Sequence, residues 1–174
     1  MDVRLEPFVA ADHLADTAGV LQRLRRVHPY YPPPADATNE IASLAAWLDD
    51  GDGYLARWVA VRGGVVVGHI SVTAPHDYIL SFLSFLDASK DLAEITKFFV
   101  DPAAQRDGVG ALLFTRARDF IRESGSVPVL AVVSTSSDAL NFYPKNGMRE
   151  LGFFEGVHGT NYVFGGETMA PISN

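Results

Sequence analysis

The stretch from residue 92 to residue 133 constrains the fold more than any other part of the chain. It opens with a strand-like run, Leu92–Val100, which leads through a glycine-containing loop into a helical pattern over 108–122. It closes with the unbroken apolar run Val129–Val133, which is typical of a strand covered on both faces. A strand, a helix and a second strand within this length predict that the two strands pair in parallel.

The helix of this unit has an apolar stripe and a glycine exit. Ser124-Gly125 is a typical end for such a helix, because glycine readily adopts the left-handed conformation that closes it. The residues that we expect to share the apolar face are Val109, Leu112, Leu113, Ala117, Phe120 and Ile121.

The rest of the chain reads as short strands and helices. Asp12 is the predicted N-cap of a helix that reaches Val27. Two β-rich runs joined by Arg62-Gly63-Gly64 predict an antiparallel hairpin over 58–70. The other predicted elements are a strand Val3–Glu6, an extended connector over 28–34, a helix around 41–48, a helical insertion within 75–90, a helix Ser136–Tyr143, and closing strands Met148–Phe154 and Tyr162–Phe164.

Composition bounds the class of protein. The chain has 174 residues, of which 48% are apolar and 20% charged, and this predicts one globule with a full core. It contains no cysteine, which excludes disulfides, thiolate metal sites and a covalent cysteine intermediate. The charged N-terminal run has no signal-like or membrane-spanning stretch, which favours a cytoplasmic location. A net charge of −7 disfavours nucleic acid and anionic membranes as partners and favours a cationic substrate.

The loop Gln105–Gly110 joins a strand end to a helix start. Glycines at a helix start leave backbone N–H groups accessible, and such donors at the positive end of the helix dipole form an anion site. A diphosphate fits this description. The competing interpretation is that Gly108 and Gly110 only allow a tight turn and close helix–strand packing.

The residues around this loop resemble motif A of the GNAT superfamily of acetyl-CoA-dependent N-acetyltransferases. The pattern Gln/Arg-x-x-Gly-x-Gly/Ala appears as Gln105-Arg106-Asp107-Gly108-Val109-Gly110, directly after Phe99-Val100-Asp101-Pro102. A second block, Ala139–Met148, is similar to the family's Ala-x-x-x-Tyr-x-x-x-Gly-Phe segment, and the matching core covers residues 92–154. The resemblance implies an α+β GNAT fold, in which residues 1–168 form a single domain with a splayed, mostly antiparallel sheet flanked by helices, and 169–174 form a C-terminal tail.

The resemblance also implies acetyl-CoA as co-substrate, without a metal, with its pantetheine arm between strand 92–100 and strand 128–134. The residues implied to hold it are Phe98, Phe99 and Val100 along the arm, Gln105, Arg106, Asp107, Gly108, Val109, Gly110 and Ala111 at the diphosphate, and Asn141 and Tyr143 at the thioester end. Two residues depart from the family's pattern. Asp107 adds a negative charge beside the phosphates, and Pro144 is expected to kink or stop the helix at Tyr143.

The chemistry requires a base, because an alkylammonium with a pKa of about 10.4 has to lose a proton before it attacks a thioester, at a cost of about 4.6 kcal/mol at pH 7. Glu94 is the predicted base. It interrupts a largely apolar strand and stands 11 residues before Gln105, the separation found in the histone-acetylating branch of the family. The alternative is a strand residue that faces solvent or pairs with an arginine.

Tyr143 is the predicted general acid toward the departing coenzyme A thiolate. The alternative is an aromatic ring that only packs against the helix and the pantetheine arm. A backbone N–H near Val100 would meet the oxyanion.

The five histidines share no metal-ligand spacing, so no metal site is predicted. We expect His69 and His76 to approach the acceptor pocket. Candidate substrate walls are Tyr30-Tyr31, Pro32–Pro34 and Tyr78–Leu86, although such residues are also common in cores.

The sequence therefore predicts an N-acetyltransferase that transfers an acetyl group directly to a primary amine of a small molecule or peptide, in a ternary complex. The alternative is a non-catalytic acyl-CoA-binding sensor or partner module, which Asp107 and Pro144 favour. Another kind of nucleotide-binding domain is disfavoured, because the sequence has no Gly-Lys-Ser/Thr and no Rossmann glycine triplet. The apolar segment Tyr162–Phe164 is compatible with a homodimer through the C-terminal strands.

Overall fold

The computed structural model describes residues 2–28, 38–51, 53–84, 91–156 and 159–169. Outside the described residues lie 29–34 of the predicted connector and substrate walls, Phe85 and Leu86 of the third candidate wall, and 170–174 of the predicted tail. In chain order the elements are β1 (Val3–Pro7), α1 (Ala10–Val27), α2 (Glu40–Leu48), β2 (Tyr54–Arg62), β3 (Val65–Thr73), α3 (Asp77–Leu83), β4 (Leu92–Val100), the 3-10 turn η1 (Pro102–Ala104), α4 (Val109–Glu123), β5 (Val127–Val133), α5 (Ser137–Lys145), β6 (Met148–Gly156) and β7 (Gly159–Gly166). None of the helices within the described ranges is long and apolar enough to cross a membrane.

The protein belongs to the α+β class, as predicted. Among the described residues, seven strands are hydrogen-bonded in the order β1-β2-β3-β4-β5-β7-β6. The pairs β1–β2, β2–β3, β5–β7 and β6–β7 are antiparallel. Strands β4 and β5 are parallel, with Leu92 opposite Val127 and Glu94 opposite Val129, which confirms the predicted parallel pair.

The chain forms two compact units. The first contains Met1–Thr73 and Thr96–Ala117, and the second contains Ala74–Ile95 and Arg118–Asn174. Strand β4 and helix α4 each contribute residues to both units, so the boundary between the units runs through these two elements.

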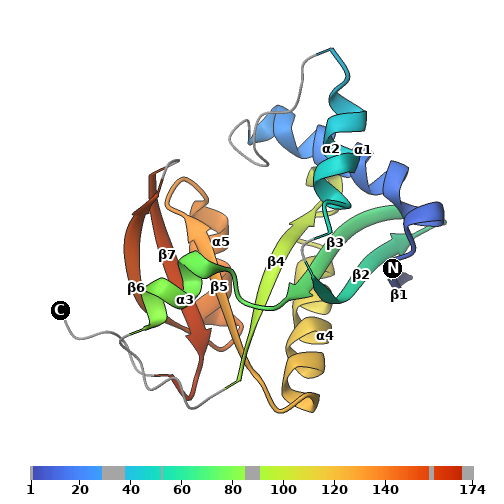
Figure 1. The fold of residues 1–174 in the computed structure, drawn as a ribbon. Coiled ribbons are helices and arrows are strands. Elements are labelled where there is room, and N and C mark those ends of the chain that lie inside the picture. Colours follow the sequence, from blue (N-terminus) through green and yellow to red (C-terminus); the bar gives the residue numbers. More distant parts are fainter. Residues whose placement is uncertain (1, 29–37, 52, 85–90, 157–158, 170–174) are drawn as a thin grey trace. The chain divides into compact units, whose positions relative to one another are not determined.

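In the first unit, helices cover both faces of the strands. Adjacent residues of β3 point to opposite faces. A Cβ added to Gly68 would lie 2.9 Å from Leu113 Cδ1 of α4 and 3.1 Å from Phe99 O, so α4 packs closely against the strand at this glycine. The neighbouring His69 stacks on Phe99, with ring centroids 5.3 Å apart, on the face that α1 and α2 cover (Figure 1). The buried core of that face consists of Ala18, Val20, Leu21, Leu24, Leu44, Leu48, Val59, Val61, Val66 and Phe99.

The predicted hairpin is β2–β3. Arg62 pairs with Val65, and the two residues between them, Gly63 and Gly64, have φ angles of +59° and +81°. Positive φ at both positions is the requirement of a type I′ turn, whose twist matches that of the strands. The glycine pair therefore fixes the register of the hairpin.

In the second unit, α3 and α5 lie on opposite faces of β5, β7 and β6 (Figure 1). Val163 of β7 shares a buried cluster with Ile79 and Leu83 of α3. The next residue, Phe164, faces Tyr143 of α5, with ring centroids 5.4 Å apart. The predicted closing strands and the helical insertion before β4 are thus confirmed, and α3 forms part of the core of this unit.

The prediction that Asp12 caps the first long helix is wrong. The N-cap of α1 is Val9, and Asp12 lies in the first turn. The N–H of Val9 donates to His13 Nδ1 at 3.0 Å. A side chain near the first turn therefore reaches back to the N–H of the N-cap residue, as the second half of a capping box does, and the N-cap itself supplies no side-chain hydrogen bond.

Two further expectations about helices need correction. Leu112, expected on the buried stripe of α4, is 42% exposed, whereas Phe114 is fully buried. The buried arc of α4 consists of Val109, Leu113, Phe114, Ala117 and Ile121, and Leu112 lies on the other side of Val109 from Phe114 around the helix. In α5, the helix passes through Pro144 and ends at Lys145, so it does not stop at Tyr143.

Lys97 in β4 combines an unusual backbone conformation with a buried charge. Its φ is +46°, and its side chain is 6% exposed. The ammonium donates to Trp47 O at 2.7 Å, to Asp50 Oδ1 at 2.5 Å and to the Tyr54 hydroxyl. Burial lowers the pKa of Lys97, but the hydrogen bonds to Asp50 and Tyr54 outweigh it and leave the pKa raised. A cation therefore binds the C-terminal end of α2, where carbonyls lack helical partners.

Replacement of Lys97 separates these two features. We expect Lys97→Ala to lower the free energy of unfolding by about 2 kcal/mol, because charge-assisted hydrogen bonds are lost, and Lys97→Gly loses the same bonds. Glycine should nevertheless be about 1 kcal/mol less harmful than alanine, since it adopts a positive φ without strain. Urea unfolding of the three proteins measures this. A glycine variant no more stable than the alanine variant would contradict the left-handed backbone at this position.

Candidate active site

A buried carboxylate fixes the loop that follows β4. Asp101 is 6% exposed and accepts hydrogen bonds from the Ala103 N–H at 3.0 Å and from Arg23 Nε of α1 at 2.7 Å. Its own N–H donates to Val67 O of β3 at 2.9 Å. The turn η1 therefore begins at a point that is tied to both α1 and β3, and the motif loop starts from this anchor.

The start of α4 has backbone donors that precede any helical partner. The first helical bond runs from the Leu112 N–H to Gly108 O at 3.0 Å, so the N–H groups of Val109, Gly110 and Ala111 lie before it. Gly108 has a φ of +82°, and a Cβ added there would meet nothing within 4 Å. The positive φ thus favours glycine at this turn, as the competing interpretation held, and the backbone donors expected after it are also present. Backbone donors of this kind at a helix start fit a diphosphate.

Two side chains of the motif loop, those of Gln105 and Asp107, bind residues outside the loop. Gln105 donates from Nε2 to Val100 O at 3.3 Å, and Arg106 has a φ of +67°. Asp107 accepts from Arg62 Nη1 of β2 at 2.8 Å. The negative charge that departs from the family's pattern is therefore balanced by a neighbouring arginine.

The predicted pantetheine strand ends in aromatic residues that pack within the first unit. The Phe98 ring lies 5.9 Å from that of Phe114 on α4, and Phe99 is buried against His69. Burial lowers the pKa of His69 to about 3, so this histidine is neutral at pH 7. Its Nδ1 lies 2.8 Å from Lys97 O and donates to it, because a carbonyl only accepts. His69 is thus part of the core of the first unit.

Glu94 is a buried carboxylate with three donors. It is 1% exposed, which contradicts the alternative of a strand residue that faces solvent. Its Oε2 lies 2.9 Å from the His76 N–H and 2.8 Å from His76 Nδ1, and its Oε1 accepts from the Tyr78 hydroxyl at 2.5 Å. The structure thus brings one expected base together with one expected pocket histidine.

Tyr143 and Asn141 occupy different environments on α5. Tyr143 is 7% exposed and packs against Phe142 and Phe164. Burial raises the pKa of its phenol above the usual range, so the phenol stays protonated at neutral pH. Asn141 is exposed, and its side-chain amide donates to Ser137 O at 3.0 Å. The packing role that we considered for Tyr143 is therefore present.

Sequence reasoning misses Arg23, Lys97 and the contact of Tyr78 with Glu94. Their partners lie 78, 47 and 16 residues away along the chain, so no local spacing reveals them. One signal was available, since Lys97 interrupts the same apolar strand that made Glu94 a candidate.

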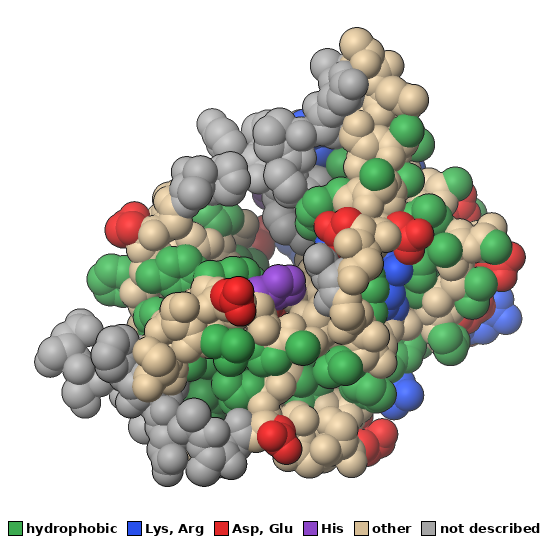
Figure 2. Space-filling model, viewed as in Figure 1, with side chains coloured by type: hydrophobic (Ala, Val, Ile, Leu, Met, Phe, Trp, Pro, Cys, Tyr) green, Lys and Arg blue, Asp and Glu red, His purple; other side chains and the backbone are tan. Residues whose placement is uncertain are grey.

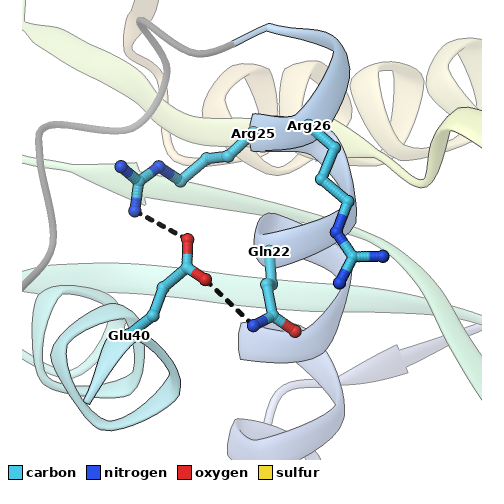
Figure 3. A pocket seen from close by; sticks show the side chains of 4 residues that line it. All are labelled: Gln22, Arg25, Arg26 and Glu40. Atoms are coloured by element: carbon cyan, nitrogen blue, oxygen red, sulfur yellow. Dashed lines mark hydrogen bonds and ion pairs between the residues drawn. The ribbon is translucent and has the colours of Figure 1, made fainter. Parts of the chain in front are cut away.

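A shallow pocket of about 140 Å³ lies on the first unit, between α1 and α2, and holds none of the motif residues. Glu40 binds Arg25 Nη1 and Gln22 Nε2 there, both at 2.9 Å (Figure 3).

On the face drawn in Figure 2, acidic side chains are scattered among apolar and uncharged ones. Within the described part of the chain, no group of three His, Asp or Glu side chains is arranged to hold a metal ion.

Solved structures with the same fold support the architecture. The ribosomal-protein-S18-alanine N-acetyltransferase from Escherichia coli has 15% identity and a TM-score of 0.66, over 99% of this chain and 97% of that one. The PaiA N-acetyltransferase from Thermoplasma acidophilum, in complex with coenzyme A, has 13% identity and a TM-score of 0.63, over 94% and 98%. NAA60 from Arabidopsis thaliana, in complex with acetyl-CoA, has 16% identity and a TM-score of 0.62, over 94% and 97%. At these identities the likeness shows the fold.

The sequence itself shows the family. No curated protein matches it. Residues 20–148, well over half of the chain, match the family described as acetyltransferase (GNAT) family. With the motif loop, the second block and the fold in agreement, this chain belongs to the GNAT family of acetyltransferases.

Proposed function

We propose that this chain is an N-acetyltransferase that transfers the acetyl group of acetyl-CoA to a primary amine of a small molecule or peptide by direct attack. The observation that carries the proposal is the start of α4, where Gly108 turns the chain with a φ of +82° and three backbone N–H groups precede the first helical bond. The solved complexes of two relatives with coenzyme A or acetyl-CoA support the choice of co-substrate.

The motif loop would bind the diphosphate through its backbone. The N–H groups at the start of α4 supply hydrogen-bond donors. They lie at the positive end of the helix dipole, whose attraction for an anion contributes about 0.3–1 kcal/mol at an exposed site. Because Arg62 pairs with Asp107, that carboxylate does not act as an unbalanced negative charge beside the phosphates. The backbone of Phe98, Phe99 and Val100 would pair with the pantetheine arm, and an N–H near Val100 would bind the oxyanion.

Acetyl transfer by this chain requires proton transfers but no covalent enzyme intermediate. Glu94 is the proposed carboxylate on which deprotonation of the amine depends, and its burial with three donors holds it in one orientation. Tyr143 is the proposed donor to the leaving sulfur. Since burial raises its pKa, it acts from the protonated form, and ionisation of this phenol should not reduce the rate between pH 7 and 9.

A second candidate function is a non-catalytic acyl-CoA-binding module. The observation that favours it is the burial of both proposed proton-transfer groups, Glu94 and Tyr143, which are 1% and 7% exposed. Calorimetry with acetyl-CoA would show binding in either case, so only turnover distinguishes the two functions.

A cytoplasmic location belongs to the proposal as well, and cell fractionation tests it.

Binding of acetyl-CoA should depend on Gly108. We expect Gly108→Ala to weaken acetyl-CoA binding at least tenfold by calorimetry, because a residue with a side chain resists a φ of +82° and shifts the amides of the helix start. The matched control is Gly64→Ala in the hairpin, where φ is +81° and a Cβ also meets nothing within 4 Å. Both variants should lose similar stability. Equal affinities in the two variants would show that the loop does not hold the co-substrate.

Turnover should appear as thiol release from acetyl-CoA with at least one amine in a panel of polyamines, amino acids, aminoglycosides and peptides. For that amine, we expect Glu94→Gln and Tyr143→Phe each to reduce kcat by about 10²–10⁴-fold, the usual contribution of a positioned acid or base. Acetyl-CoA affinity should change little. Tyr162→Phe, in β7 of the same unit, is the matched control and should be silent. No release above hydrolysis with any amine, together with tight acetyl-CoA binding, would favour the binding module.

A further inference from the structure

Glu94 is shielded from a substrate by its own partners. Its side chain is 1% exposed, and both carboxylate oxygens already accept hydrogen bonds, Oε2 from His76 and Oε1 from Tyr78. The imidazole of His76, by contrast, is 35% exposed. Of these two side chains, His76 is therefore the one that an amine can reach directly.

The hydrogen bonds define which nitrogen of His76 is available. Glu94 Oε2 already accepts the backbone N–H of His76, and with this oxygen as the acceptor of the ring contact the Nδ1 at 2.8 Å carries the proton and donates it. In this tautomer Nε2 holds a lone pair and is the basic atom. The His76 backbone N–H donates to the same Oε2 at 2.9 Å, so two bonds to one oxygen fix the residue and its ring together.

Tyr78 completes the arrangement from α3. Its ring stacks on that of His76 at 5.6 Å with an interplanar angle of 17°, and its hydroxyl donates to the second oxygen of Glu94 at 2.5 Å. The stack limits rotation of the imidazole, while the hydroxyl limits rotation of the carboxylate. The titratable groups that face His76 are thus Glu94 from β4 and Tyr78 from α3, and both belong to the second unit.

We infer that His76 is the catalytic base that takes the proton from the acceptor amine, and that Glu94 and Tyr78 are positioning residues that hold its Nε2 toward that amine. This inference rests on the proposed function. It assigns the direct contact to the histidine, whereas the buried carboxylate orients the ring and stabilises the imidazolium that forms.

Acetylation of an ammonium removes two of its three nitrogen-bound protons. The ammonium of the acceptor gives one proton to His76 Nε2, which later releases it to solvent. The nitrogen lone pair then forms the C–N bond with the thioester carbon, and the C–S bond breaks with its electron pair on sulfur. The nitrogen also loses a second proton, which balances the one that the sulfur takes up to become a thiol. The products are the amide, coenzyme A thiol and one released proton.

The ring and the carboxylate also favour one class of acceptor. A neutral imidazole backed by a buried carboxylate attracts an ammonium and can accept its proton, which suits an alkylamine that is charged at pH 7. An amine that is already neutral at pH 7 has no need of this base.

The test compares four proteins with two forms of the acceptor that the panel identifies. One form is the ordinary alkylamine, and the other carries fluorine atoms beside the amine, so that it is neutral at pH 7. His76→Asn puts an amide N–H near the position of Nδ1 but removes Nε2. Tyr78→Phe removes one positioning bond, and His28→Asn, at the exposed end of α1, is the control.

With the alkylamine, we expect His76→Asn to lower kcat at least about 100-fold with little change in the KM for acetyl-CoA, and Tyr78→Phe to lower it about tenfold. With the fluorinated amine, the loss in His76→Asn should shrink to less than about tenfold, whereas a purely structural defect would affect both amines alike. His28→Asn should be silent. Equal losses with the two amines, or no loss in His76→Asn, would overturn the assignment.

A second measurement does not depend on turnover. In ¹⁵N-edited NMR spectra of the full chain, the His76 ring should show a protonated Nδ1 and an unprotonated Nε2, and Glu94→Gln should disturb this tautomer. The opposite tautomer in the parent protein would overturn the inference while leaving acetyl transfer intact. Absence of turnover in the parent protein, with the expected tautomer present, would instead contradict the proposed function.

Discussion

The start of α4 presents a set of backbone N–H groups that precede the first helical hydrogen bond. These donors exist because Gly108 turns the chain into the helix with a positive φ, and because Asp101, bound to Arg23 and β3, holds the preceding turn in place. A helix start of this kind attracts a phosphate without any basic side chain. This explains how a chain with a net charge of −7 can bind a polyanionic co-substrate.

Strand β4 carries two buried charges that have opposite signs and different tasks. Glu94 lies in the second unit, where His76 and Tyr78 donate to it, and Lys97 lies in the first, where it donates to the end of α2. A buried charge is tolerated only where partners satisfy it, and removal of one partner costs more than the pair contributes. The two residues stand three positions apart, and Lys97 has a positive φ.

Periodicity and turn chemistry predicted most of the fold. The Gly63-Gly64 hairpin, the parallel pair around α4 and the exit at Gly125 each follow from a local pattern that agrees with the tertiary contacts. Asp12 was predicted as a cap because its residue type is typical of one, but the helix begins earlier, with Val9 as its N-cap, and the N–H of Val9 donates to His13. The prediction that Leu112 is buried was wrong, because a stripe predicted from spacing alone is wider than the arc of the helix that the neighbouring strands cover.

The candidate site was predicted only in part, because its chemistry comes from contacts that are distant in sequence. Glu94 stood out as a polar residue in an apolar strand, whereas its partners are on a segment before β4 with no spacing rule that connects them. The most direct test of the central claim is a crystal structure of this chain with acetyl-CoA. We predict diphosphate oxygens at about 3 Å from the backbone nitrogens at the start of α4. A diphosphate bound elsewhere, or a helix start filled by side chains of the protein, would contradict the account.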